Sequence, residues 1–288
     1  MSRLYVLGAG GRVPTQQRQT CCYVLETRRG LVFLDAGTGV SRLHDPLFQG
    51  LLTRSRRVRV LLCGYSLDRI AGLSWLPTFL GDHELVIAGP PSAGEGPEAV
   101  LMRTLAPPFH PGGFEAWRSS FASVSFQTFE DGKNLVAGEP VLVRMLAGDP
   151  EPSCAVRVRE AVYATGCVAR PETAELASRA SVLVHDASRT SDAAGGEVAT
   201  SASAAEAATL AQEALVQDLI LAHLGPDQDT AAVESMLFEA TARFPRSVTA
   251  ADMMCFKMAG VPDEEELTEE ELAEDDADVD AEDEIQVS

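Results

Sequence analysis

The chain has 288 residues, of which 45% are hydrophobic, and it carries a formal net charge of −20. A chain of this length and composition can bury a substantial core, which excludes a fully disordered protein. No apolar run approaches the roughly 18 residues that a membrane span needs, and the first residues lead into a strand rather than a signal peptide, so we expect a cytoplasmic protein without a membrane partner.

The negative charge is concentrated near the C-terminal end. Of the 43 acidic residues, 15 lie between Asp263 and Ser288, where no basic residue occurs, which leaves 28 acidic against 23 basic residues elsewhere. Like charges at this density repel one another and oppose packing. We therefore predict one domain over residues 1–259 and a disordered acidic tail over 260–288, which a basic partner could bind. The slightly acidic remainder argues against direct binding of duplex nucleic acid.

The first part of the chain alternates short apolar runs with helical patterns. Apolar runs bounded by glycine or proline indicate strands, and apolar residues at helical spacing indicate helices. In chain order we predict strands at 3–9, 20–27 and 30–37, a helix at 43–56, a strand at 58–64, a helix at 68–80 and a strand at 84–90. Arg54, Arg56, Arg57 and Arg59 form a basic run, which we interpret as the solvated end of the first helix.

The second part of the chain repeats this organisation. Here we predict helices at 97–105 and 114–121, strands at 140–146, 153–160 and 161–166, a helix at 172–180, a strand at 181–187, a helix at 201–215, a strand at 218–225 and a helix at 230–244. The chain thus contains two blocks of strands, each followed by helices, without a linker between them. This order is typical of an α/β domain with four layers, an αββα sandwich in which two sheets pack face to face between outer helices.

Seven segments carry a more specific signal. They are LGAGGRVPTQQRQTCCYVLE (7–26), GLVFLDAGTG (30–39), RIAGLSWLP (69–77), AVYATGC (161–167), SVLVHDAS (181–188), SASAAEAATLAQEA (201–214) and DLILAHLGP (218–226). In this order they resemble the metallo-β-lactamase-fold hydrolases, especially the branch of ribonuclease Z and related phosphodiesterases. The resemblance covers roughly residues 3–245, and it implies the αββα fold, a centre of one or two zinc or similar ions, and a homodimer, which is frequent in this branch.

The metal-binding loop of those hydrolases has the form His-x-His-x-Asp-His, which directs imidazole and carboxylate donors at one point. The corresponding stretch here retains only the aspartate, Asp68. Gly64 and Ser66 stand at the first two histidine positions and cannot replace imidazole. Arg69, a permanent cation that repels a divalent ion, stands at the third.

Three further ligand positions of the resembled family fall later in the chain. Gly148 or Asp149 stands at the mid-chain histidine, Gly166 stands at the aspartate that bridges the metals, and His223 retains the final histidine. Only Asp68 and His223 remain, which is too few donors to hold a metal ion. The sequence therefore predicts no cofactor and a catalytically degenerate pseudoenzyme that acts as a binding or regulatory protein.

One alternative keeps a metal. If the strand before Cys167 slips by one residue, Asp68, Cys167 and His223 would form a mononuclear zinc site, and the protein would be a metal-dependent hydrolase or phosphodiesterase. His185 and Asp186 resemble the strand-end pair of the family, whose acidic member supports proton transfer. Without a metal we expect that pair to have a structural hydrogen-bonding role.

The predicted partners follow from the emptied pocket. Without a metal beside it, the Arg69 guanidinium would be free to bind a phosphate or carboxylate group in a bidentate fork. We therefore expect either a small anionic ligand or a protein partner.

Overall fold

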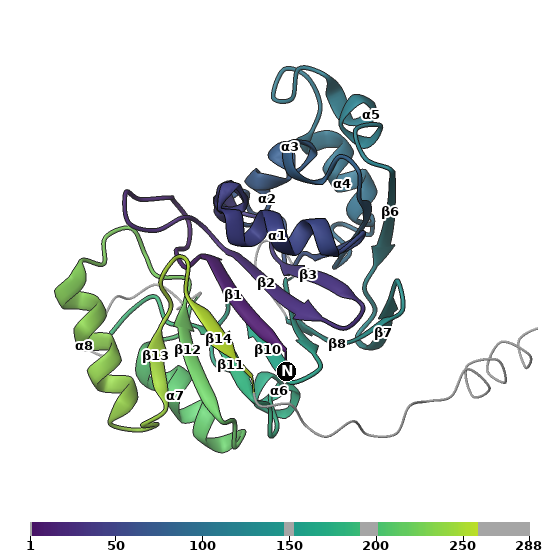
Figure 1. Ribbon diagram of the computed structural model, residues 1–288. Helices are drawn as coiled ribbons and strands as arrows, with labels where there is room; N and C mark the ends of the chain where they lie inside the picture. Colours follow the sequence, from purple (N-terminus) through teal and green to yellow (C-terminus); the bar gives the residue numbers. More distant parts are fainter. Residues whose placement is uncertain (1, 147–152, 191–200, 259–288) are drawn as a thin grey trace, which may run out of the picture. The chain divides into compact units, whose positions relative to one another are not determined.

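Two mixed sheets form the framework of the protein (Figure 1). The computed structural model describes residues 2–146, 153–190 and 201–258. The first sheet has the strand order β14-β1-β2-β3-β4-β5-β6. Its strands are β1 (Arg3–Gly8), β2 (Cys22–Thr27), β3 (Gly30–Leu34), β4 (Arg57–Leu61), β5 (Glu84–Gly89), β6 (Ser123–Thr128) and β14 (Cys255–Lys257). The pairs from β14 to β3 are antiparallel, and those from β3 to β6 are parallel.

The second sheet has the order β13-β12-β11-β10-β9-β8-β7. Its strands are β7 (Gly132–Val136), β8 (Glu139–Leu146), β9 (Ser153–Val158), β10 (Ala161–Ala164), β11 (Val182–Asp186), β12 (Asp218–Ala222) and β13 (Ser247–Thr249). The pairs from β7 to β10 are antiparallel, and those from β10 to β13 are parallel. Both sheets therefore present a group of parallel strands whose carboxyl ends are available to build a site.

The helices lie on the outer faces of the two sheets (Figure 1). Those after strands of the first sheet are α1 (Pro46–Arg54), α2 (Leu67–Ile70), α3 (Pro77–Leu80), α4 (Pro97–Thr104) and α5 (Gly113–Arg118), with 3-10 turns at Thr38–His44 and Ala71–Trp75. Those after strands of the second sheet are α6 (Pro171–Leu176), α7 (Ala204–Glu213) and α8 (Thr230–Thr241). Ser203 caps α7 in a reciprocal capping box with Glu206, which fixes where that helix begins.

Three hydrophobic clusters fill the spaces between the layers. One joins the first sheet to its helices, one lies between the sheets, and one joins the second sheet to α6, α7 and α8. Strand β1 shows how the sequence produces this arrangement. Leu4 and Val6 point into the cluster between the sheets, whereas Tyr5 and Leu7 point into the helical side, because successive strand residues face opposite ways. The predicted αββα architecture is confirmed.

Some local predictions were wrong. The helix expected at 68–80 is divided into α2, a 3-10 turn and α3. Gly72 explains part of the division, because a Cβ there would lie 2.2 Å from the Gly37 carbonyl oxygen, so the turn packs directly against backbone. Pro77 then begins α3 at a position that needs no amide donor. The short strands β6, β7, β13 and β14 were not predicted.

The basic run is also corrected. Arg59 is not at a solvated helix end but on β4, where it is fully buried. Its guanidinium donates to the carbonyl oxygens of Val136 at 2.8 Å, Ala137 at 2.6 Å and Arg29 at 2.9 Å. Arg59 therefore ties the first sheet to the turn between β7 and β8, and a buried arginine is tolerated because its donors are satisfied.

Two sequence-based expectations lie outside the described residues. These are the position of Asp149 and the acidic tail over 260–288. By its internal contacts, Met1–Met258 forms one compact unit. None of the helices in the described ranges has the length and apolar character of a membrane-spanning segment.

Candidate functional site

The candidate site is assembled at the carboxyl ends of strands from both sheets. Asp35 follows β3, Asp68 and Arg69 lie on α2 beyond β4, Asp186 ends β11, and His223 follows β12. Asp35 and His223 have φ angles of 57° and 58°. Non-glycine residues rarely adopt this left-handed conformation, and it occurs where the surrounding structure imposes it, frequently at functional sites.

The first half of the site is a buried ion pair. Arg69 Nη1 lies 2.7 Å from Asp35 Oδ2, with the side chains 5% and 0% exposed. Asp35 also accepts from the Tyr163 hydroxyl at 2.9 Å and from the Cys63 amide at 2.8 Å, and Arg69 donates to the Thr165 carbonyl oxygen. Burial by itself would lower the pKa of Arg69. The negative charge of Asp35 has the larger, opposite effect, so the pKa of Arg69 lies well above its ordinary value. The guanidinium is a permanent cation inside the protein.

Two glycines lie beside Arg69, and one of them leaves the space that its guanidinium fills. A Cβ at Gly166 would lie 2.3 Å from Arg69 Nη2, and a Cβ at Gly64 would lie 3.4 Å from Arg69 Cδ. Gly166 also has a φ of +63°, which disfavours a side chain. Of the two expected ligand positions, Gly166 is thus the one whose missing side chain admits Arg69, and Gly64 lies in ordinary contact distance of it. The expectation of a free guanidinium was wrong, because Nη1 of Arg69 is paired with Asp35 and Nη2 donates to the Thr165 carbonyl oxygen.

The second half of the site is a row of three side chains. His223 Nε2 lies 3.0 Å from Asp68 Oδ2, and His223 Nδ1 lies 2.9 Å from Asp186 Oδ2. The Arg12 amide donates to Asp68 Oδ2 at 3.0 Å, and the Gly166 amide donates to Asp186 Oδ2 at 2.8 Å. The two carboxylates are therefore oriented by backbone donors, and each faces one nitrogen of the same ring.

The two carboxylates favour the charged form of His223. Burial by itself would lower the pKa of His223. The opposite effect of Cys21, Asp186 and Asp68 is larger, so the pKa of His223 lies well above its usual value. Burial raises the pKa of Asp68, but its hydrogen bonds to His223 and Ser66 outweigh burial and hold that pKa well below its usual range. The row therefore places a buried imidazole between two acidic side chains, and their negative charges favour its protonated form.

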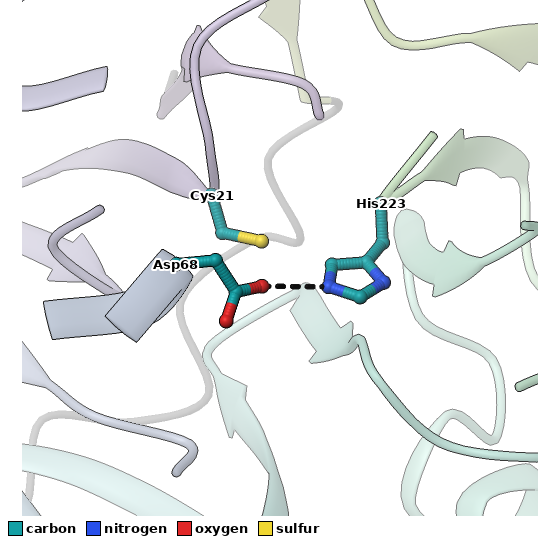
Figure 2. A group of neighbouring side chains, drawn as sticks. All are labelled: Cys21, Asp68 and His223. Atoms are coloured by element: carbon teal, nitrogen blue, oxygen red, sulfur yellow. Dashed lines mark hydrogen bonds and ion pairs between the residues drawn. The ribbon is translucent and has the colours of Figure 1, made fainter. Parts of the chain in front are cut away.

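Cys21 completes this half of the site, and sequence reasoning missed it. Figure 2 shows its side chain beside Asp68 and His223, and one potential ligand atom from each of the three lies within 4.8 Å of the others. Cys21 precedes β2 and is 1% exposed, and its thiol donates to the Gly10 carbonyl oxygen at 3.4 Å. In the sequence it is one of six scattered cysteines, without the paired spacing that signals a metal site.

Other predicted residues lie beside the site. Among the described residues, the metal-ligand group contains Cys21 rather than Cys167; Cys167 is buried, and burial raises the pKa of its thiol to about 12. His185 is fully buried, with Nδ1 2.9 Å from the Asp186 carbonyl oxygen, and burial lowers its pKa. Ser66 is exposed at the start of α2.

Comparisons with known proteins place this geometry in context. No family model matches the chain. Ribonuclease Z of Methanosarcina mazei is 25% identical over 309 residues, which covers 91% of this chain and 100% of that protein. The metallo-β-lactamase fold protein YhfI of Bacillus subtilis superposes with a TM-score of 0.69 at 18% identity, covering 89% and 100% of the two chains. Unliganded yeast PDE1 gives 0.64 at 13%, covering 87% and 98%.

The chain has the metallo-β-lactamase fold. The predicted resemblance is thereby confirmed, with ribonuclease Z-like and phosphodiesterase-like neighbours. The two-metal centre associated with this fold does not fit the residues present. Gly64 and Gly166 offer no donor, and Arg69 fills the space beside both with a fixed positive charge. Asp68 and His223 are retained, and they face each other across a single hydrogen bond.

Proposed function

We propose that this chain is a metallo-β-lactamase-fold binding or regulatory protein in which a built-in cation has replaced the two-metal hydrolytic centre. The observation that carries the proposal is the position of the Arg69 guanidinium, which lies in the space left by Gly166, close to Gly64, and is bound to Asp35. A second metal ion next to this guanidinium would be repelled by it at low effective dielectric, because Asp35 is already paired with Arg69 and cannot fully offset both charges.

The charges of the pocket support the same proposal. Three carboxyl groups converge there, from Asp35, Asp68 and Asp186, and two cationic side chains, Arg69 and His223, lie against them. In a metal-dependent hydrolase the ions neutralise such carboxylates and supply the activated water. Here side chains provide the neutralising charge, and side chains do not lower the pKa of a water molecule as a divalent ion does.

A hydrolysis assay tests the loss of activity. We expect the purified protein with added Zn²⁺ or Mn²⁺ to hydrolyse bis(p-nitrophenyl) phosphate at the rate of the protein-free blank. Asp68→Asn should leave that rate unchanged, as should the surface control Arg57→Met. A metal-dependent rate above the blank that disappears in Asp68→Asn but persists in Arg57→Met would contradict the proposal.

A metal-dependent phosphodiesterase is the competing function. It is favoured by the similarity to the Methanosarcina mazei ribonuclease Z and by the retained pair of Asp68 and His223. Its sequence-based form uses Cys167 as the third zinc ligand. That form requires hydrolytic activity and zinc binding that are both lost in Cys167→Ser. Under the binding-protein proposal there is no activity to lose, and Cys167→Ser leaves any bound metal unchanged. The hydrolysis assay together with zinc analysis of Cys167→Ser therefore separates the two functions.

The acidic segment suggests the partner. We propose that residues 260–288, with their 15 acidic side chains, attract a basic protein surface, and that the folded part associates as a homodimer. Capture of partners by the full chain and by a chain ending at residue 259 tests the first point, since a segment-dependent partner disappears from the second. Sedimentation of both chains measures the oligomeric state, which we expect to be dimeric in each.

A further inference from the structure

Three potential metal ligands converge in the half of the site that does not contain the ion pair of Arg69 and Asp35. Cys21 enters from the segment before β2, Asp68 from α2 and His223 from the end of β12 (Figure 2). All three are nine-tenths buried or more, with exposures of 1%, 9% and 9%. The family resemblance already placed Asp68 and His223 in one site, whereas the approach of Cys21 to them is a property of the fold alone.

We propose that Cys21, Asp68 and His223 bind a single zinc-like divalent ion. Their ligand atoms lie within 4.8 Å of one another, and donors around a tetrahedral zinc ion stand about 3.5 Å apart, given bonds of about 2.0–2.3 Å. Small side-chain rotations therefore suffice to bring the three donors to one ion. The site differs from the sequence-based alternative because Cys21 takes the place given there to Cys167.

The surroundings of the three donors suit this role. Asp186 lies 2.9 Å from His223 Nδ1, which leaves Nε2 directed at Asp68. A carboxylate on the far nitrogen of a histidine fixes the ring and increases its basicity toward zinc. Asp186 is held in turn by the amides of Gly166 and Ser188, and Asp68 by the amide of Arg12.

The donor types select the ion. One sulfur, one nitrogen and one oxygen favour zinc or cobalt over magnesium or calcium, which prefer oxygen donors alone. Binding requires the Cys21 thiol and the protonated His223 ring each to lose a proton to solvent, the ring from Nε2, and the resulting thiolate and the Asp68 carboxylate neutralise the ion. Arg69 stays with Asp35, so the fixed cation and the bound ion have separate carboxylate partners.

Cobalt spectroscopy tests the assignment without reference to catalysis. We expect Co²⁺ to bind the chelator-treated full chain with a near-ultraviolet thiolate charge-transfer band, and one equivalent of Zn²⁺ to displace it. Cys21→Ser should remove the band, whereas the matched control Cys167→Ser should keep it. Asp186→Asn, which leaves every ligand in place, should weaken Zn²⁺ binding by roughly 10–100-fold.

The remaining outcomes are also decisive. Absence of a cobalt band in the wild-type chain overturns the proposal, as does a band that survives Cys21→Ser or disappears only in Cys167→Ser. If Cys21→Ser fails to fold, Asp68→Asn takes its place and should keep the thiolate band with weaker affinity. The site is independent of the proposed loss of hydrolysis: ion-dependent hydrolysis would refute that loss, whereas a missing band would refute only the site.

Discussion

Replacing Arg69 by methionine should be strongly destabilising. The substitution removes the positive charge next to Asp35, which is fully buried. Of the three groups that donate hydrogen bonds to Asp35, only the Tyr163 hydroxyl and the Cys63 amide then remain. It also removes the donor to the Thr165 carbonyl oxygen. Removing one partner of a buried ion pair costs about 3–5 kcal/mol, and methionine occupies most of the vacated volume, so we expect a loss of about 4 kcal/mol in the free energy of unfolding.

Urea denaturation followed by circular dichroism measures this loss. The control is Arg57→Met, which removes an exposed arginine 3.0 Å from Glu84 and should cost at most about 1 kcal/mol. The double variant Arg69→Met/Asp35→Asn should be more stable than the sum of the single losses predicts, by up to about 3 kcal/mol. A loss in Arg69→Met no larger than in Arg57→Met, or strict additivity with Asp35→Asn, would show that the ion pair does not hold the site together.

Three further predictions use the same denaturation assay. Gly166→Ala should cost at least about 1 kcal/mol more than Gly94→Ala, because both glycines have positive φ but only the first would place a Cβ against Arg69; equal losses would contradict the clash. Arg59→Met should cost about 3 kcal/mol, because it removes the donors to the buried carbonyl group of Val136 and to the part-buried carbonyl groups of Ala137 and Arg29; a loss below about 1 kcal/mol would refute that reasoning. The pKa of His223 is raised in the folded, chelator-treated protein, so its protonation stabilises the fold fully at pH values below the unfolded pKa of about 6.5, and this contribution is lost as the pH rises through the folded pKa. His223→Gln should therefore flatten the fall in stability above neutral pH. An unchanged profile of stability against pH would exclude this titration.

The sequence by itself determined the layers of the protein. Apolar runs such as that of β11, where every residue is buried, indicate strands covered on both faces, and their grouping into two blocks indicates two sheets. The positions of Gly64, Gly166 and Arg69 also showed that a family ligand set was incomplete. These signals are readable because burial and secondary structure act on neighbours along the chain, where periodicity records them.

Tertiary structure decided what the altered pocket contains. Arg69 was expected to be free, and only the convergence of β3 and β10 supplies Asp35 and the Thr165 carbonyl oxygen as its partners. Cys21 gave no sequence signal, and it joins Asp68 and His223 only because the segment before β2 lies against both. Contacts of this kind join strand ends that are distant in the chain, so their chemistry depends on the register and packing of two sheets, which no local pattern encodes.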